Sequence, residues 1–133
     1  MLTLLAGCAT TGQRSVKDEE VLQKASQELH EDQLLDVWIE LFDPGELPKD
    51  KDDARGLSMD IREAEARHMP VHLRGVMEKT GYWGAVRVVP RDTEGAEVLV
   101  SGTILESNGE DLVLQINAQD ASGNQWFERS YSS

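Results

Sequence analysis

Apolar and polar residues alternate along the C-terminal third of the chain, and this period of two predicts β-strands with one buried face. The expected core face of a strand over residues 97–107 comprises Val98, Val100, Gly102 and Ile104. The expected core face of the next strand, residues 112–119, comprises Leu112, Leu114, Ile116 and Ala118. A further strand is expected from Trp126 to Tyr131. Turn residues separate the three segments, so the pattern predicts an antiparallel meander.

Two features of the meander carry local information. Asn108-Gly109 stands between its first two strands, and we expect a two-residue hairpin turn there because both residues tolerate positive φ. A slip of one residue at this turn would expose the core face of the second strand, so the turn is expected to set the register. Gly102 in mid-strand indicates a bulge or a close neighbour that needs its missing side chain.

The first half of the chain contains one strand and one long helix by the same reasoning. Residues 34–42 are β-branched and aromatic on nearly both faces, which predicts a strand that ends at Asp43-Pro44-Gly45. The Lys- and Asp-rich residues 46–56 indicate a solvated loop whose aspartates lack the spacing of a calcium-binding EF-hand. A helical stripe then runs over about 58–80, which comprises Ile61, Ala64, His68, Val71, Leu73, Val76 and Met77.

The ends of this helix have recognisable signals. Ser58 is expected to cap its N-terminus and Gly81 to close it in the left-handed conformation. Pro70 lies inside the stripe and is expected to kink the helix or to begin a second one. After Trp83-Gly84, residues 85–89 predict a short strand ended by Pro90.

Ahead of these elements, a thin apolar stripe predicts a short amphipathic helix over about residues 16–30; it comprises Val21, Leu22, Ala25 and Leu29. The resulting fold class is α+β, with the order β-α-β-β-β and the last three strands as the meander. This order corresponds to a four-stranded, mostly antiparallel sheet covered by one long helix, with the short helix at the N-terminus.

Length and charge limit the function classes. The chain has 133 residues, one domain's worth, and 13 basic against 25 acidic residues give a net charge of −12. An acidic surface of this size repels phosphate backbones and argues against a nucleic-acid partner. No run approaches the roughly 20 apolar residues of a membrane span.

The one cysteine, Cys8, follows Leu5-Ala6-Gly7, and this run resembles a bacterial lipobox. Small residues ahead of the cysteine fit a signal-peptidase cleft, and the thiol and the freed amine take acyl chains that anchor a protein firmly. Seven residues without Lys or Arg are short for a signal peptide, so we expect the signal to begin upstream. The expected organisation is a truncated signal peptide over 1–7, a lipidated tether over 8–15 and one envelope domain over 16–133.

Four further segments resemble small periplasmic domains, namely the amino-terminal domain of the Tol–Pal translocation protein and the cores of the curli-secretion and penicillin-binding-protein-activator lipoproteins. They are 37–45 (VWIELFDPG), 86–90 (VRVVP), 98–104 (VLVSGTI) and 120–123 (DASG). Residues 61–67 with 81–90 also resemble a family of uncharacterised proteobacterial lipoproteins. The resemblance implies a fold and a compartment. Ala9 after the cysteine, by resemblance to Gram-negative lipoproteins, favours the periplasmic face of the outer membrane.

Candidate chemistry in the folded part is sparse. His68 and His72 are four residues apart, as in helices that bind zinc, and Glu65 could be a third ligand if the helix were straight. Pro70 disturbs the turn that would align the two rings. We therefore expect no metal or other cofactor. Arg62, Glu63, Glu65 and Arg67 are expected to form a solvated helix face. The tryptophans Trp38, Trp83 and Trp126 are expected in packing roles, with a partner-binding patch as the alternative.

The hypothesis that these observations favour is a non-enzymatic envelope lipoprotein that binds a protein partner or assembles with itself. A subunit of a secretion or export assembly is the alternative, and a metal-dependent hydrolase ranks last. An open apolar face is also expected on the side of the sheet away from the long helix. We expect either a missing C-terminal segment or a partner to cover it; its members are Trp38, Phe42, Leu99, Leu105, Val113, Phe127 and Tyr131.

Overall fold

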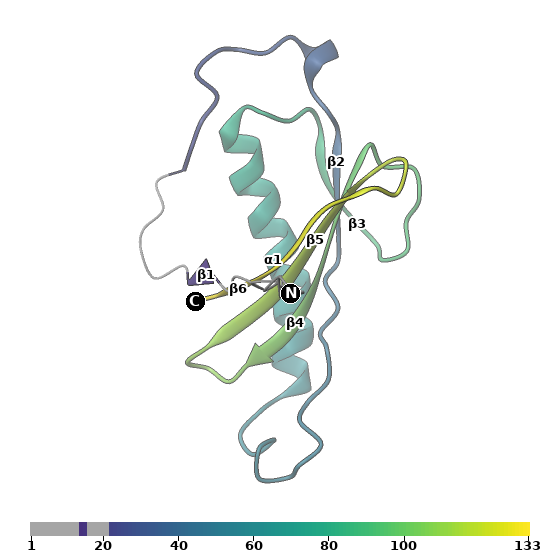
Figure 1. The fold of residues 1–133 in the computed structure, drawn as a ribbon. Coiled ribbons are helices and arrows are strands. Elements are labelled where there is room, and N and C mark those ends of the chain that lie inside the picture. The colour runs from purple at the N-terminus through teal and green to yellow at the C-terminus, as the bar shows by residue number, and fades with distance from the viewer. Residues whose placement is uncertain (1–13, 16–21) are drawn as a thin grey trace, which may run out of the picture.

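The computed structural model describes residues 14–15 and 22–133, and it has an α+β fold with one α-helix packed on a mixed sheet (Figure 1). The α+β class predicted from the sequence is therefore confirmed. The elements in chain order are β1 (Arg14–Ser15), a 3-10 turn (Glu31–Gln33), β2 (Val37–Glu40), α1 (Met59–Thr80), β3 (Val86–Val89), β4 (Val98–Ser107), β5 (Leu112–Asp120) and β6 (Gln125–Ser132).

The sheet order is β1-β6-β5-β4-β2-β3. The meander β4-β5-β6 is antiparallel, as predicted, whereas β2 pairs in parallel with both β3 and β4. The predicted count of four strands is wrong, because it omitted the short strand β3 that the sequence itself indicates. The described sheet has five strands of four or more residues, and the two-residue β1 joins the outer side of β6 in parallel.

Two crossovers on opposite faces of the sheet produce the parallel pairing around β2. Helix α1 connects β2 to β3 on one face, and residues 90–97 lead back across β2 to β4 on the other. A Cβ placed on Gly95 would lie 3.7 Å from the Trp38 indole, so this connection packs directly on that ring. The two connections run in opposite directions on opposite faces and so have the same hand, as the preference for one hand in parallel crossovers requires.

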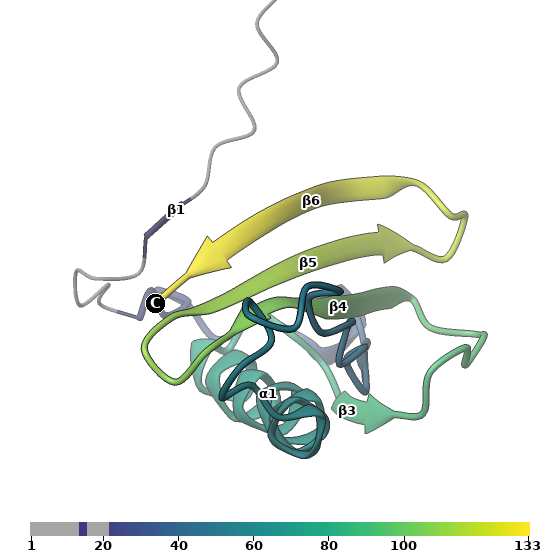
Figure 2. The ribbon, with the colours of Figure 1, turned by 90° about the horizontal axis from the view of Figure 1, so that it is seen from below.

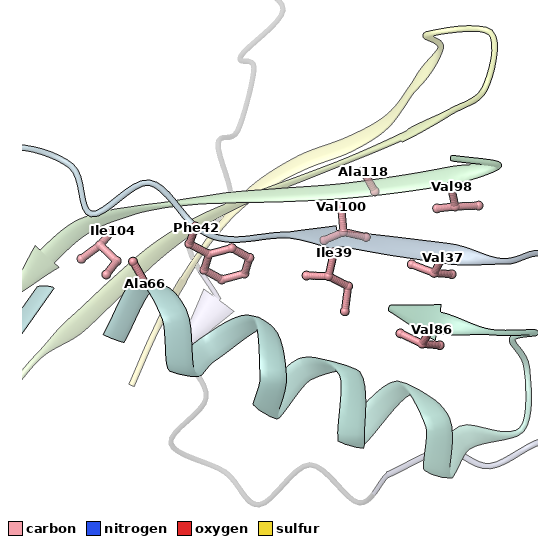
Figure 3. Close-up of a cluster of buried hydrophobic side chains, with 9 residues drawn as sticks. All are labelled: Val37, Ile39, Phe42, Ala66, Val86, Val98, Val100, Ile104 and Ala118. Carbon is pink, nitrogen blue, oxygen red and sulfur yellow. The ribbon is translucent and has the colours of Figure 1, made fainter. Parts of the chain in front are cut away.

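This arrangement explains why β2 is apolar on both faces. Val37 and Ile39 are fully buried beneath α1, and Trp38 on the other face is half-buried under the crossover loop. Figure 3 shows the core side chains between the sheet and α1. The buried cluster comprises Val37, Ile39, Phe42, Ala66, Val86, Val98, Val100, Ile104 and Ala118.

The predicted ends of α1 are confirmed. Ser58 accepts a hydrogen bond from the backbone N–H of Ile61 at 3.4 Å, and Gly81 closes the helix in the left-handed conformation with φ 75°. The helix is one element from Met59 to Thr80, so Pro70 does not begin a second helix.

Pro70 is accommodated inside α1 by a hydrogen bond from the sheet. A residue at this position would normally donate its N–H to the carbonyl of Ala66, and proline has no N–H. The backbone N–H of Phe42, just beyond β2, donates to Ala66 O at 3.0 Å instead. Both Pro70 and Ala66 are buried, and the small alanine lets the strand approach. The proline thus frees an acceptor that ties α1 to the end of β2.

Arg62 does not lie on a solvated helix face, and that prediction is wrong for this residue. Its side chain is 2% exposed and reaches under the sheet. Nη1 donates to the carbonyls of Pro44 and Ile104, both at 3.2 Å, and Nη2 donates to Leu105 O at 3.5 Å. The register of β4 against β5 shifts between Ile104 and Glu106, so Arg62 binds carbonyls at a β-bulge. Glu65 is also partly buried, whereas Glu63 and Arg67 are exposed as expected.

Gly102 makes room for an aromatic ring, which confirms the predicted close neighbour. A Cβ on Gly102 would lie 2.9 Å from three atoms of the Phe42 ring. We expect Gly102→Ala to lower the free energy of unfolding by about 1–3 kcal/mol, the usual cost of overpacking a core. Denaturant unfolding measures this cost, and Gly75→Ala is the control because a Cβ there meets nothing within 4 Å. Phe42→Leu in the same chain should recover part of the loss, and strictly additive costs in this double-mutant cycle would contradict the contact.

The predicted N-terminal helix is wrong where the structure describes it. Residues 22–30 contain no helix, and residues 16–21 lie outside the described part of the chain. The backbone N–H of Ala25 donates to Thr80 O at 2.7 Å, and the Tyr82 hydroxyl donates to Lys24 O at 3.2 Å. The thin apolar stripe buries too little surface to stabilise a helix, and the segment packs instead along the C-terminal end of α1.

The β4–β5 hairpin lies where Asn108-Gly109 predicts it, but the turn is longer than two residues. Ser107 pairs with Leu112, so four residues form the loop, and only Gly109 has positive φ. The Asn108 side chain accepts hydrogen bonds from the backbone N–H groups of Glu110 and Asp111 at 2.9 and 2.7 Å. Asparagine therefore acts through its side chain in an Asx-type turn.

Candidate functional site

The face of the sheet away from α1 is polar and hollowed. Here β4, β5 and β6 present the side chains that alternate with the core residues, and the crossover loop adds its own polar groups. They surround a shallow hollow of about 300 Å³, which we call the polar hollow. Its lining comprises Glu40, Leu41, Asp43, Arg91, Asp92, Ser101, Gly102, Thr103, Gln115, Asn117 and Glu128.

Charge in the polar hollow is mostly negative. Four carboxylates line it against one guanidinium, and Arg91 lies 3.5 Å from an oxygen of Asp43. Glu40 accepts a hydrogen bond from the backbone N–H of Asp92 at 3.0 Å, which holds the crossover loop against β2. Asp92 is in the left-handed region, with φ 61°, a conformation that aspartate tolerates better than most residues. The hollow can therefore attract cationic groups.

A second surface lies on the helix side of β5 and β6. Helix α1 packs on β3, β4 and β2, and Figure 2 shows β5 and β6 curving away beyond it. The apolar side chains on these two strands are only partly buried, and most of them pack against the edge of the core. We call this surface the apolar strip; it comprises Leu112, Leu114, Ile116, Phe127 and Tyr131.

The apolar strip corrects the expected position of the open apolar face. Phe42 is buried in the core beneath α1. Phe127 pairs with the core residue Ala118, and Tyr131 pairs with Leu114, so both lie on the helix side of the sheet. The face away from the helix retains Trp38, Leu99 and Val113, all partly buried, among largely polar neighbours. Leu105 lies at the β4 bulge and is 47% exposed. Most of the open apolar surface therefore lies on the same side as α1.

The three tryptophans lie in different environments and form no common patch. Trp38 packs under the crossover loop, and Trp83 packs against the core cluster at the end of α1. Trp126 in β6 is 46% exposed. Trp38 and Trp83 thus have the expected packing roles, and Trp126 is the tryptophan with the most surface free for the alternative, a partner-binding role.

The histidines and acidic loops form no metal centre in the described part of the chain. His68 and His72 are both exposed, with ring centroids 6.3 Å apart. In residues 14–15 and 22–133, no three His, Cys, Asp or Glu side chains are grouped so that they could hold a metal ion. Asp50 accepts a hydrogen bond from the backbone of Asp52, which itself pairs with Arg55 at 2.9 Å. The loop aspartates thus stabilise their own turn.

The carboxylate of Asp120 stabilises the turn between β5 and β6. Asp120 accepts hydrogen bonds from the backbone N–H groups of Ser122 and Asn124 at 2.9 and 3.0 Å. Desolvation raises the pKa of Asp120, but hydrogen bonds from Asn124, Ser122 and Trp126 outweigh it, so the pKa lies below its ordinary value of 3.8. The carboxylate is ionised at neutral pH and holds the start of β6 in place.

Sequence reasoning placed some of these residues and missed others. Cys8 and the lipobox residues Leu5, Ala6 and Gly7 lie outside the described residues. The strip residues of β5 were predicted as a buried face from their alternation, and that is the signal that identifies them. No sequence signal separated Arg62 from its solvated neighbours, because its partners are backbone carbonyls from distant segments.

Comparison with known proteins adds no relative. No protein-family model, curated protein or solved structure matches the chain. Within the described residues, no helix is long and apolar enough to cross a membrane.

Proposed function

We propose that this chain is a non-enzymatic, protein-binding domain of the bacterial cell envelope, held at the membrane by lipid on Cys8. The observation that carries the binding role is the apolar strip, which α1 leaves without cover. Partly exposed aromatic and aliphatic side chains on two adjacent strands are typical of a surface that a partner completes. The polar hollow on the opposite face of the sheet is negatively charged, so this domain can also attract a basic partner.

The membrane tether rests on sequence chemistry. Leu5-Ala6-Gly7-Cys8 has the residue sizes that lipoprotein processing requires, and several acyl chains on one cysteine make a firm anchor. Between Cys8 and the described fold lie small and polar residues that fit a tether. Following the resemblance to Gram-negative lipoproteins, we place the domain at the outer membrane, facing the periplasm.

One experiment tests the anchor and the binding surface together. A photo-cross-linking amino acid is placed at Phe127 in the strip, or at Asp53 in the solvated loop as the control. The chain is expressed in a Gram-negative host behind a complete lipoprotein signal peptide that ends at Gly7. We expect cross-links to an envelope protein from position 127 but none from position 53. We expect the protein in the membrane fraction with a fatty-acid label incorporated during growth, and Cys8→Ser should abolish the label.

The two parts of the proposal fail separately. A wild-type chain that takes up no fatty-acid label, or a Cys8→Ser variant that still takes it up, would refute the lipid anchor. Equal cross-linking from both positions, or none from either, would refute the strip as a binding surface. A purified chain that turns over a substrate would refute the non-enzymatic role.

A further inference from the structure

The two borders of the described sheet differ in how well they are protected. At one border, β3 has only four residues and is followed directly by Pro90, so it offers little backbone to another chain. At the other, β6 has eight residues and contains neither proline nor lysine, the residues that commonly block edge strands. Figure 2 shows β6 along the outer side of β5. Of the two borders in the described residues, the β6 side therefore offers the longer backbone for strand addition.

The outer side of β6 already accepts a strand at one end. Residues Arg14 and Ser15 of β1 pair in parallel with Tyr131 and Ser132. Among the described residues, no strand pairs with the outer side of residues 125–130. At about 3.3 Å per residue, these six residues form about 20 Å of edge whose outward N–H and C=O groups pair with no other strand that the structure describes. The β1 pairing shows that the backbone of this edge can form a further ladder.

The side chains of β6 give the two faces of this edge different chemistry. On the helix side, Phe127 and Tyr131 belong to the apolar strip, and the Arg129 guanidinium lies 5.7 Å from the centre of the Phe127 ring. On the other side, Glu128 lines the polar hollow, which also contains the carboxylates of Glu40, Asp43 and Asp92. A strand added here would meet apolar surface on one face and negative charge on the other.

We propose that residues 125–130 of β6 bind an extended segment of a partner protein by strand addition, and that this segment alternates apolar with basic residues. The inference rests on the proposed protein-binding function and names the kind of partner. Apolar side chains of the segment lie beside the apolar strip, and basic ones face Glu128. A second copy of the chain is the poorer occupant, because it brings a net charge of −12 against −12.

The test uses the full chain and a fluorescein-labelled twelve-residue peptide that alternates valine and lysine. Two modified peptides carry N-methyl groups on alternate amides, one set on each edge of the extended peptide. Strand addition uses only one peptide edge, so exactly one of the two modified peptides should bind at least tenfold more weakly in fluorescence anisotropy. The bound peptide should slow amide hydrogen exchange of residues 125–130.

Charge is tested with two matched variants. Glu128→Lys should weaken the unmodified peptide about threefold to fivefold more than Asp53→Lys, which changes the same charge in a distant exposed loop. Peptides that bind equally with either set of N-methyl groups would show simple charge attraction and overturn the proposal. Absence of binding, protection of another surface, or a dimer formed through β6 would also overturn it.

The outcomes separate this inference from the function on which it rests. Cross-links from position 127 to an envelope protein, without protection of residues 125–130 by the peptide, would leave a binding domain that works without strand addition. Absence of both results would remove the binding surface itself.

Discussion

Gly45→Ala should lower the free energy of unfolding by about 4 kcal/mol. Gly45 has φ 67°, where a side chain costs about 1–2 kcal/mol. A Cβ there would also overlap the backbone carbonyl of Ile104 and lie 3.2 Å from an Arg62 nitrogen. The overlap involves backbone on both sides, so no side-chain rotation relieves it, and it adds a further few kcal/mol. Thermal and denaturant unfolding measure the loss.

Gly56→Ala is the matched control for this substitution. Gly56 also has positive φ, at 80°, but a Cβ there meets nothing within 4 Å. Gly56→Ala should therefore lower the free energy of unfolding only by the cost of positive φ, about 1–2 kcal/mol. Equal losses in the two variants would show that the close approach of Gly45 to β4 does not matter for stability.

Arg62→Met should lower the free energy of unfolding by about 3 kcal/mol, and this is the second large effect that we expect. The substitution keeps much of the apolar stem but removes the donors to three carbonyls, those of Pro44, Ile104 and Leu105. Carbonyl groups that are buried without a hydrogen-bond donor destabilise the folded state by the free energy of their desolvation. The loss should appear as a lower unfolding midpoint in urea together with faster amide exchange around the β4 bulge.

Two variants separate the role of Arg62 from a general effect of charge. Arg67→Met removes the same charge from an exposed position of α1 and should change stability by less than about 0.5 kcal/mol. Arg62→Lys keeps the charge but has one nitrogen in place of the planar fork, and it should recover only part of the loss. Full recovery by lysine would mean that charge alone, and not the fork, matters at this site.

The contacts of Gly45 and Arg62 with the β4 bulge, which we call the clamp, also affect the position of the strands that carry the apolar strip. The clamp ties α1 and the turn after β2 to the bulge of β4, and β4 is the strand on which β5 and β6 are built. A loosened bulge would change how the outer strands curve away from α1. Variants of the clamp should therefore be compared for stability before any loss of partner binding is assigned to the strip.

Short-range patterns in the sequence were sufficient for most local elements. The cap at Ser58, the left-handed Gly81, the meander and the core face of β5 each depend on residues within a few positions of one another. Gly102 was identified as a close-approach site because a glycine in mid-strand is unfavourable without one. The lipobox context of Cys8 is also a property of sequence alone, and it stays a prediction.

Long-range packing decided the features that the patterns missed. Residues 90–97 have the composition of a tight turn, and only tertiary structure shows them crossing β2 to make parallel neighbours. The hydrogen bond from Phe42 to the carbonyl freed by Pro70, and the burial of Arg62, both involve partners far away in the chain. The apolar strip lies open because α1 covers the sheet only as far as β4. Local spacing fixes which side chains share a face, but the position of one element over another depends on backbone groups and ring contacts between distant segments.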